Sequence, residues 1–188
     1  MIRRALDIAV ASAVLLAASP LIALAAVAIR LESRGDAIYR QRRVGLDGRE
    51  FDVLKLRTMV SGAERMGSGL AVDVGDARIT RVGALLRRTS LDELPNLVNV
   101  IRGEMSLIGP RPTVPEQVAR YDERQRGRLA VKPGLTGWAQ VNGRASLPWS
   151  ERIELDLYYI AHRSPPWASA RSVRMTILAS KRGERCSM

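Results

Sequence analysis

The chain has 188 residues, the size of one ordinary domain, and 30 Lys and Arg against 19 Asp and Glu give it a net charge of +11. Hydrophobic residues make up 46% of the chain, which excludes a disordered polar tail, and a single Cys and a single His exclude an intrachain disulfide and a Cys/His zinc site. A chain this basic needs an anionic partner, which leaves phosphate ligands, an anionic membrane surface or a nucleic-acid backbone.

The first element is an apolar run of 22 residues from Ile8 to Ile29, interrupted only by Ser12, Ser19 and Pro20. A straight helix of this length is about 33 Å long, enough for a bilayer core of about 30 Å. Pro20 lies near the middle of the run, where it removes a backbone donor and kinks a helix.

Three topologies are open for this run. It could be a single spanning helix, or a cleaved signal peptide with Arg3 and Arg4 before it and Ala23-Leu24-Ala25 as the cleavage site. It could also be a re-entrant helix that enters and leaves by the same face. Basic residues flank both ends of the run, and a spanning helix would put one cluster on the wrong side of the membrane. We therefore expect residues 1–34 to form a re-entrant membrane helix broken at Ser19-Pro20, and residues 35–188 to form a domain at the cytoplasmic face.

The remainder predicts an α+β fold that is mostly helical with a small β-hairpin. Turn residues 45–48 separate the two expected strands, 37–41 and 51–56, and residues 61–77, 109–112 and 132–144 are rich in Gly or Pro and predict loops. A helix is expected over residues 94–101, and Gly103 is expected to end it. Further helices are expected over residues 79–88, 116–129 and 149–160, and a last element over 165–181, where an interfacial helix and ordinary core packing are both open.

The segment from Arg87 to Pro95 contains two adjacent carboxylates, Asp92 and Glu93. Ser90 and Glu93 have the spacing of a capping box, and Asp92 could instead be the N-cap, because Pro95 has no N–H to donate inside a helix. Capping is the more ordinary role of such residues. The chemical alternative is that one carboxylate attacks phosphorus, forming an acyl phosphate, while the other holds Mg²⁺, which binds one or two carboxylates together with substrate phosphates.

A phosphate substrate would also require basic side chains near this segment, because arginine binds phosphate oxygens in bidentate fashion. Each candidate taken singly is more typical of a solvated surface cation, but the group lies beside Gly- and Pro-rich loops. The candidates are Lys55, Arg57, Arg87, Arg88, Arg111 and Arg144.

Five motifs in order resemble the bacterial sugar transferases, and among them the small monotopic polyprenyl-phosphate phosphoglycosyl transferases. The resemblance runs from about Ile2 to Lys181. Its motifs are Lys55-Leu56-Arg57-Thr58-Met59, the Asp76 to Gly83 segment, Thr89-Ser90-Leu91-Asp92-Glu93-Leu94-Pro95-Asn96, the Met105 to Pro112 segment, and the Lys132 to Arg144 segment.

The resemblance implies transfer of a phospho-sugar from a UDP-sugar to undecaprenyl phosphate with release of UMP, the first membrane step of glycoconjugate assembly. It makes Asp92 the nucleophile that forms a covalent intermediate, and Glu93, with Asp92, the ligand of Mg²⁺. It places Arg111 at a phosphate-binding position and Lys55, Arg88 and Asp156 near the active site. Ser19-Pro20 matches the family's helix-breaking pair.

The implied location is the cytoplasmic face of the bacterial inner membrane, against anionic inner-leaflet lipid, which attracts basic residues. Leu56, where the family has Phe, and Ala145, where it often has Asn, depart from the pattern. Three alternatives remain: an inactive membrane-associated scaffold, a true glycosyltransferase that releases UDP, and a basic nucleic-acid-binding module. The arginines lie mostly in loops and not on a recognition helix, so we expect no nucleic acid as partner.

Overall fold

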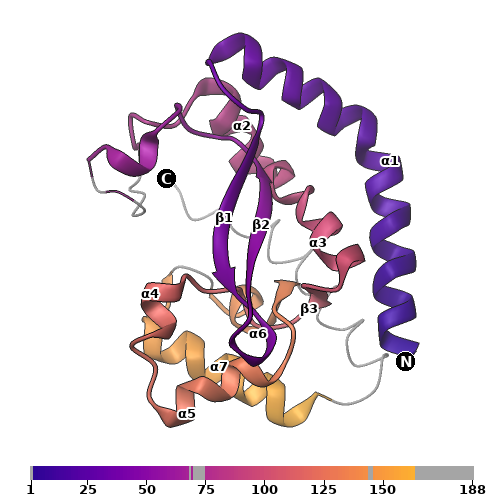
Figure 1. The fold of residues 1–188 in the computed structure, drawn as a ribbon, viewed down its shortest axis with the longest axis vertical. Helices are drawn as coiled ribbons and strands as arrows, with labels where there is room; N and C mark the ends of the chain where they lie inside the picture. Colours follow the sequence, from indigo (N-terminus) through magenta and orange to yellow (C-terminus); the bar gives the residue numbers. More distant parts are fainter. Residues whose placement is uncertain (1, 68, 70–74, 144–145, 164–188) are drawn as a thin grey trace.

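The computed structural model describes residues 2–67, 69, 75–143 and 146–163 of the chain. A long helix, α1 (Ile2–Glu32), runs along one side of the molecule, a two-stranded hairpin lies beside it, and short helices gather around the far end of the hairpin (Figure 1). The described residues are mostly helical with small sheets, so the expected fold class is confirmed.

Helix α1 is long and apolar enough to cross a membrane by length and composition. Only 11% of its most apolar window is buried against the rest of the chain, which is unlike the core helix of a soluble protein. The exposed side chains include Leu16, Leu24 and Leu31. This surface is therefore available to an apolar environment outside the protein.

The Ser19-Pro20 pair lies inside α1 and does not divide it into two helices, which differs from the expected break. Pro20 cannot donate to the carbonyl of Leu16, its partner four residues back. The Ser19 hydroxyl donates to that carbonyl instead, at 2.8 Å. The pair thus removes one ladder hydrogen bond and replaces it from a side chain, and α1 bends along its length (Figure 1).

The N-terminal turns of α1 are tied to the rest of the protein by three charged residues. Arg4 donates to the carbonyls of Val100 and Ile101 near the end of helix α3 (Asn96–Arg102), and Asp7 accepts from the Ser106 hydroxyl at 2.7 Å. Arg3 donates to the carbonyl of Ile108, the last residue of a short strand, and to the hydroxyl of Tyr159 in the last described helix. Arg3 and Arg4, which flank the N-terminal end of the apolar run, are therefore also docking residues.

Strands β1 (Ile38–Val44) and β2 (Glu50–Leu56) pair antiparallel, and the turn between them contains the left-handed residue Asp47 (φ 55°). The expected hairpin is confirmed, with a longer first strand. Cross-strand neighbours share a face, so the register places Tyr39, Gln41 and Arg43 on the same face as Phe51, Val53 and Lys55. Val53 from this face joins a core cluster that contains Ala11 of α1, Leu97, Val100 and Met105.

Helices α2 (Arg81–Thr89) and α3 (Asn96–Arg102) follow, and Gly103 ends α3 in a left-handed conformation (φ 90°), as expected. Between them lies a 3-10 turn over Leu91–Glu93. The last long helix, α7 (Trp149–His162), matches its prediction closely. The element expected over residues 165–181 lies outside the described residues.

Two predictions for the middle of the chain are wrong. Residues 116–129 are not one helix but three short ones, α4 (Pro115–Val118), α5 (Glu123–Arg126) and a 3-10 helix (Gly127–Ala130), because Asp122 starts a new helix through a capping box with Gln125. The expected loop 132–144 contains β4 (Gly134–Thr136), parallel to β3 (Ser106–Ile108), and α6 (Trp138–Val141). Gly134 is needed there, since a Cβ would lie 2.0 Å from the nitrogen of Gly109.

Candidate active site

Asp92 and Glu93 lie in the 3-10 turn between α2 and α3. Ser90 is the left-handed residue (φ 57°) that ends α2, and neither the 3-10 turn nor α3 has a side-chain cap. Both capping interpretations are therefore wrong. The two carboxylates do not serve the helix termini, which leaves them for other partners.

Glu93 is held between two cations that come from distant parts of the chain. Its Oε1 accepts from Lys55 Nζ of β2 at 2.7 Å and from Arg111 Nη2 at 2.8 Å. Burial by itself would raise the pKa of Glu93, but Arg111 and Lys55 lower that pKa to about 2. Glu93 is therefore ionised at any physiological pH.

Asp92 is the less constrained of the two carboxylates. Burial raises its pKa from the usual Asp value, the Lys55 charge opposes the rise and the adjacent Glu93 adds to it. In the part of the chain that the structure describes, its carboxylate makes no ion pair or hydrogen bond with another side chain. The Asp92 carboxylate is thus partly desolvated, and no other described side chain binds it.

An open depression of about 280 Å³ lies beside Glu93. Basic side chains line one part of it and apolar residues and Asn96 line the rest. Its lining residues are Arg43, Val53, Lys55, Glu93, Asn96, Met105, Arg111, Pro112, Gly134 and Leu135. The Gly-rich segment after Lys132 and the segment before Pro112 thus meet at this depression, through the β3–β4 pair.

Arg43 is a functional candidate that the sequence interpretation missed. Burial, followed by the positive charge of Arg111, lowers its pKa to about 10, and its guanidinium donates to the carbonyl of Pro112 at 3.4 Å. The signal that could have found it is the hairpin register, which puts Arg43 on the same face as Lys55. Three basic side chains, Arg43, Lys55 and Arg111, therefore converge on one depression.

Arg57 was expected to bind substrate, and in the structure it binds backbone groups of the chain itself. Its buried guanidinium donates to the carbonyls of Ser33 and Arg34 at 2.7 and 2.8 Å, where the chain leaves α1. Alternate residues of a strand share a face, so the sequence suggests that Lys55 and Arg57 point the same way. The strand β2 ends at Leu56, however, so only Lys55 lies within it. Arg57 fastens the end of α1 to the hairpin.

Arg88 and its neighbour Arg87 have different surroundings. Arg88 is exposed at the end of α2 and makes no hydrogen bond or ion pair within the described residues. Arg87 donates to the Thr58 hydroxyl at 2.8 Å, and its charge lowers the pKa of Asp92. The structure thus associates Arg87 with the nucleophile candidate more directly than Arg88. Arg144 lies outside the described residues.

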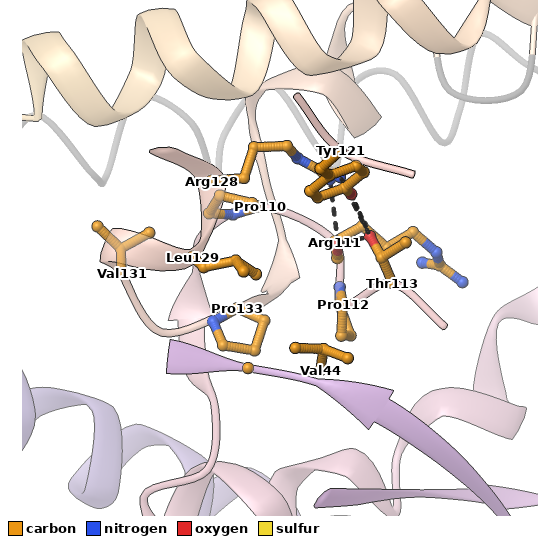
Figure 2. A pocket seen from close by; sticks show the side chains of 11 residues that line it. Val44, Pro110, Arg111, Pro112, Thr113, Tyr121, Arg128, Leu129, Val131 and Pro133 are labelled. Carbon is orange, nitrogen blue, oxygen red and sulfur yellow. Dashed lines mark hydrogen bonds between the residues drawn. The ribbon is translucent and has the colours of Figure 1, made fainter. Parts of the chain in front are cut away.

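Asp156 was also expected at the substrate site, and the structure places it behind that site. It is 1% exposed and pairs with Arg128 at 2.6 Å. Arg128 in turn donates to the hydroxyls of Tyr121 and Thr113 and, at 3.2 Å, to the carbonyl of Arg111 (Figure 2). Burial raises the pKa of Asp156, and Arg128 opposes the rise. Asp156 therefore supports the loop that carries Arg111 and does not itself reach the depression.

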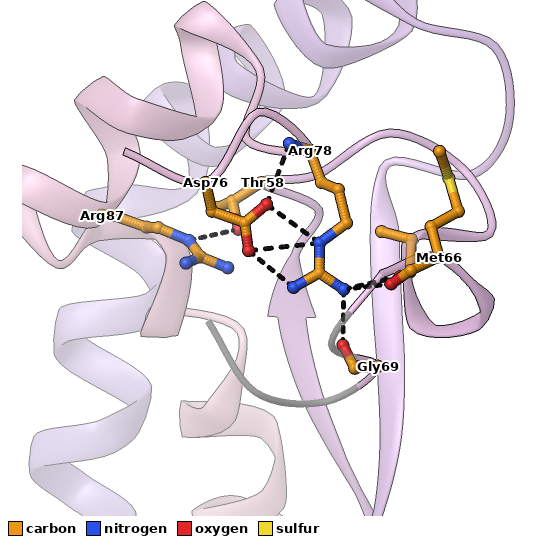
Figure 3. Close-up of polar contacts among 7 residues, drawn as sticks. Thr58, Met66, Gly69, Asp76, Arg78 and Arg87 are labelled. Carbon is orange, nitrogen blue, oxygen red and sulfur yellow. Dashed lines mark hydrogen bonds and ion pairs between the residues drawn. The ribbon is translucent and has the colours of Figure 1, made fainter. Parts of the chain in front are cut away.

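The motif from Asp76 to Gly83 contains a second buried ion pair (Figure 3). Arg78 pairs with Asp76 at 2.6 Å and donates to the carbonyls of Ala63, Met66 and Gly69 at 2.6 to 2.9 Å. The Arg78 guanidinium thus binds three carbonyls of the segment that follows the hairpin, and it orders that segment.

The carboxylates of this site supply only part of the ligands that Mg²⁺ needs. No group of three or more His, Cys, Asp or Glu lies together among the described residues, and one oxygen of Glu93 already serves two cations. Asp92 and Glu93 alone do not complete the coordination shell of Mg²⁺. They fit an ion that takes its other ligands from a diphosphate and water, which is the usual arrangement for Mg²⁺ with phosphate substrates.

Comparison with known proteins gives consistent results. A family model described as "Bacterial sugar transferase" matches residues 1–182. The chain is 39% identical to the "Uncharacterized sugar transferase EpsL" of Bacillus subtilis (strain 168), over 85% of this chain and 78% of that protein. It is 41% identical to the "UDP-glucose:undecaprenyl-phosphate glucose-1-phosphate transferase" of Escherichia coli (strain K12), over 94% of this chain and 39% of that protein.

A third relative is the "UDP-N-acetylgalactosamine-undecaprenyl-phosphate N-acetylgalactosaminephosphotransferase" of Aeromonas hydrophila, 42% identical over 87% of this chain and 40% of that protein. The chain spans about two fifths of the length of the relatives from Escherichia coli and Aeromonas. The names of these two relatives contain different sugars but the same lipid phosphate, undecaprenyl phosphate.

Proposed function

Because this chain belongs to the bacterial sugar transferase family, we propose that it transfers a sugar phosphate from a UDP-sugar to undecaprenyl phosphate and releases UMP. The printed activities of its relatives support this class of donor and acceptor. The main observation in support of the proposal is that the carboxylate pair, Asp92 and Glu93, lies beside three basic side chains that converge on one depression. Glu93 is ionised and shared by Lys55 and Arg111, while Asp92 has no competing side-chain partner among the described residues.

In the first step, an Asp92 carboxylate oxygen attacks the phosphorus that carries the sugar. The new bond is the O–P bond of an aspartyl phospho-sugar, and the bond that breaks joins this phosphorus to the bridging oxygen of the diphosphate, which leaves with UMP. Burial raises the pKa of Asp92, and this partial desolvation fits the role, since a partly desolvated carboxylate is a better nucleophile than a solvated one.

In the second step, an oxygen of undecaprenyl phosphate attacks the same phosphorus. The aspartyl O–P bond breaks, Asp92 is regenerated as a carboxylate, and the product is undecaprenyl diphosphate bearing the sugar. One site serves the donor and then the acceptor, because UMP leaves before the lipid phosphate enters.

The basic residues of the depression bind the oxygens of both anionic substrates. Arg111 and Lys55 exchange part of their interaction with Glu93 for phosphate oxygens, and Arg43 adds a third positive charge. Arg111 is about half exposed, so its guanidinium is accessible to an incoming ligand. We propose that Asp92 and Glu93 hold Mg²⁺, which when bound with the diphosphate neutralises charge that develops on its oxygens.

We further propose that α1 is re-entrant and that both of its ends face the cytoplasm, with the catalytic residues at the level of the lipid headgroups. Two observations support this: the replacement of a ladder hydrogen bond at Ser19-Pro20, and the docking of both ends of α1 on the same body of the protein. Arg4 ties one end to α3, and Glu32 at the other end accepts from the first two N–H groups of α2. The implied location is the inner membrane, with anionic lipid around the basic surface.

The test measures UMP release by the detergent-purified chain with a panel of UDP-sugars, undecaprenyl phosphate and Mg²⁺. Asp92→Asn is expected to lower this rate by on the order of 10⁴-fold or more, as the loss of a nucleophile does in other covalent mechanisms. Intact-mass measurement with donor alone should show one phospho-sugar added to the wild type and none to the variant. Asp47→Asn in the exposed hairpin turn is the matched control and should behave as the wild type.

Release of UDP instead of UMP would identify a glycosyltransferase and refute the proposal. An inert scaffold would release neither nucleotide, and full activity of Asp92→Asn would exclude the covalent route. Salt-sensitive binding of duplex DNA without turnover would favour a nucleic-acid-binding module.

A further inference from the structure

Asn96 is a buried amide without a partner in the catalytic depression. It is the first residue of α3, only 3% exposed, and lines the depression with Lys55, Glu93 and Arg111. Its Oδ1 is fully buried and accepts no hydrogen bond, and within the described residues its Nδ2 donates none. The Asn96 amide therefore neither caps the start of α3 nor pairs with another polar group of the described core.

Asn99, one turn further along α3, shows how a structural amide is used in the same helix. It is fully buried, and its Oδ1 accepts from the backbone N–H of Leu54 at 3.1 Å. Its Nδ2 donates to the carbonyl of Asp52 and to Glu104, both at 2.7 Å. Buried polar groups are nearly always paired, because desolvation without a partner is unfavourable. The contrast singles out Asn96 as a group whose partner is a ligand.

The backbone directs Asn96 to the same side as the two carboxylates. The residues between Glu93 and Asn96 have right-handed helical conformations, with Leu94 at φ −56°, ψ −38° and Pro95 at φ −61°, ψ −19°. Positions three and four apart share a face in such a backbone, and Asn96 follows Glu93 by three residues and Asp92 by four. Its amide is thus presented to the ligand that these carboxylates meet.

The lining of the depression indicates which part of the ligand the Asn96 amide contacts. Apart from Asn96 and the charged residues, the lining side chains are apolar or glycine. Recognition of sugar hydroxyls requires a mixture of neutral donors and acceptors, whereas phosphoryl oxygens require donors only. Rotation about the last side-chain bond exchanges the two ends of the amide, so that an N–H can be directed into the depression.

Resting on the proposed function, we propose that Asn96 is a substrate-binding residue that donates a hydrogen bond to an oxygen of the phosphoryl group being transferred. The group that it contacts is the β-phosphate of the donor, which UDP has and UMP lacks. Asn96 then remains with the phospho-sugar when UMP leaves.

The experiment combines binding, turnover and thermal unfolding of the detergent-purified full chain. Asn96→Leu, which keeps the branched shape, is expected to weaken UDP binding about 10-fold while UMP binding is unchanged, the size of effect that follows from loss of one hydrogen bond to a charged group. UMP release should fall about 100-fold with every UDP-sugar that the wild type uses, as on removal of a single transition-state donor. The Tm should equal or exceed that of the wild type, because an unpaired buried amide has been removed.

Asn99→Leu is the matched control and should lower the Tm, because it leaves Leu54 and Asp52 backbone groups unpaired. Asn96→Ala, which cannot overpack the site, should show the same loss of UDP binding as Asn96→Leu. Equal UDP affinity in wild type and both Asn96 variants would overturn the inference, and so would a Tm loss in Asn96→Leu as large as in Asn99→Leu. A change confined to particular sugars would assign Asn96 to the sugar and also overturn it. Absence of UMP release from the wild type refutes the proposed function separately, because the UDP and UMP affinities do not depend on turnover.

Discussion

The buried pair of Asp156 and Arg128 provides the sharpest test of how the Arg111 loop is held. Both side chains are nearly inaccessible, 2% and 4% exposed, and one Asp156 oxygen accepts from Nη2 and Nε of Arg128 at 2.6 and 3.0 Å. Asp156→Asn removes the negative charge and leaves the guanidinium buried. If Asp156 contacted substrate, the same change would lower activity without affecting stability.

The magnitude follows from what Arg128 retains. Breaking a buried ion pair by removing one partner costs about 3–5 kcal/mol. Arg128 keeps three neutral acceptors, on Tyr121, Thr113 and Arg111, so the expected loss for Asp156→Asn is at the lower end, about 3 kcal/mol. For a chain of this size each kcal/mol shifts Tm by about 2–4 °C, so the expected decrease is about 6–12 °C.

The assay is thermal unfolding in detergent, combined with UMP release at a temperature where the variant is folded. The single variants Arg128→Met and Asp156→Leu together with their double variant form a double-mutant cycle, and we expect the double variant to lose less stability than these two single changes together. UMP release should fall mainly through a higher KM for the UDP-sugar, because the Arg111 loop loses support. An unchanged Tm together with reduced kcat would refute this reasoning and return Asp156 to the substrate site.

Two further predictions concern the nucleophile and the docking of α1. The proposed nucleophile, Asp92, must be ionised to attack, and its pKa is raised, so UMP release should fall as the pH drops through that pKa while Glu93, with a pKa of about 2, is still ionised. Lys55→Met removes a charge that lowers the Asp92 pKa, so it should move this acid limb of the kcat/KM profile to higher pH, and a limb that stays in place would contradict the assignment. Arg4→Ala should destabilise the protein by about 1.5–3 kcal/mol in thermal unfolding, because it removes charged donors from the end of α3, whereas Arg30→Ala on the exposed surface of α1 should not; equal Tm values for the two variants would contradict the docking role.

The parts of the fold that were predicted correctly have local signals. A long apolar run predicted α1, strand residues around a Gly-rich turn predicted the hairpin, and Gly103 marked the end of α3. The parallel β3–β4 pair was missed because each strand has three residues and their pairing depends on residues far apart in the chain. The Ser90 and Asp92 caps were wrong because α3 begins only after Pro95.

The apolar N-terminal helix, the adjacent carboxylates Asp92 and Glu93 in a family motif, and the excess of basic residues near them can all be predicted from the sequence. Which of those basic residues meet the carboxylates depends on the tertiary structure. Arg43, Lys55 and Arg111 converge on the depression beside Glu93, whereas Arg57 binds the end of α1 and Asp156 supports the Arg111 loop from behind. The physical reason is that composition and spacing specify the charge of a side chain, but its direction is set by strand register and by packing between segments as distant as β2 and the Pro-Arg-Pro loop.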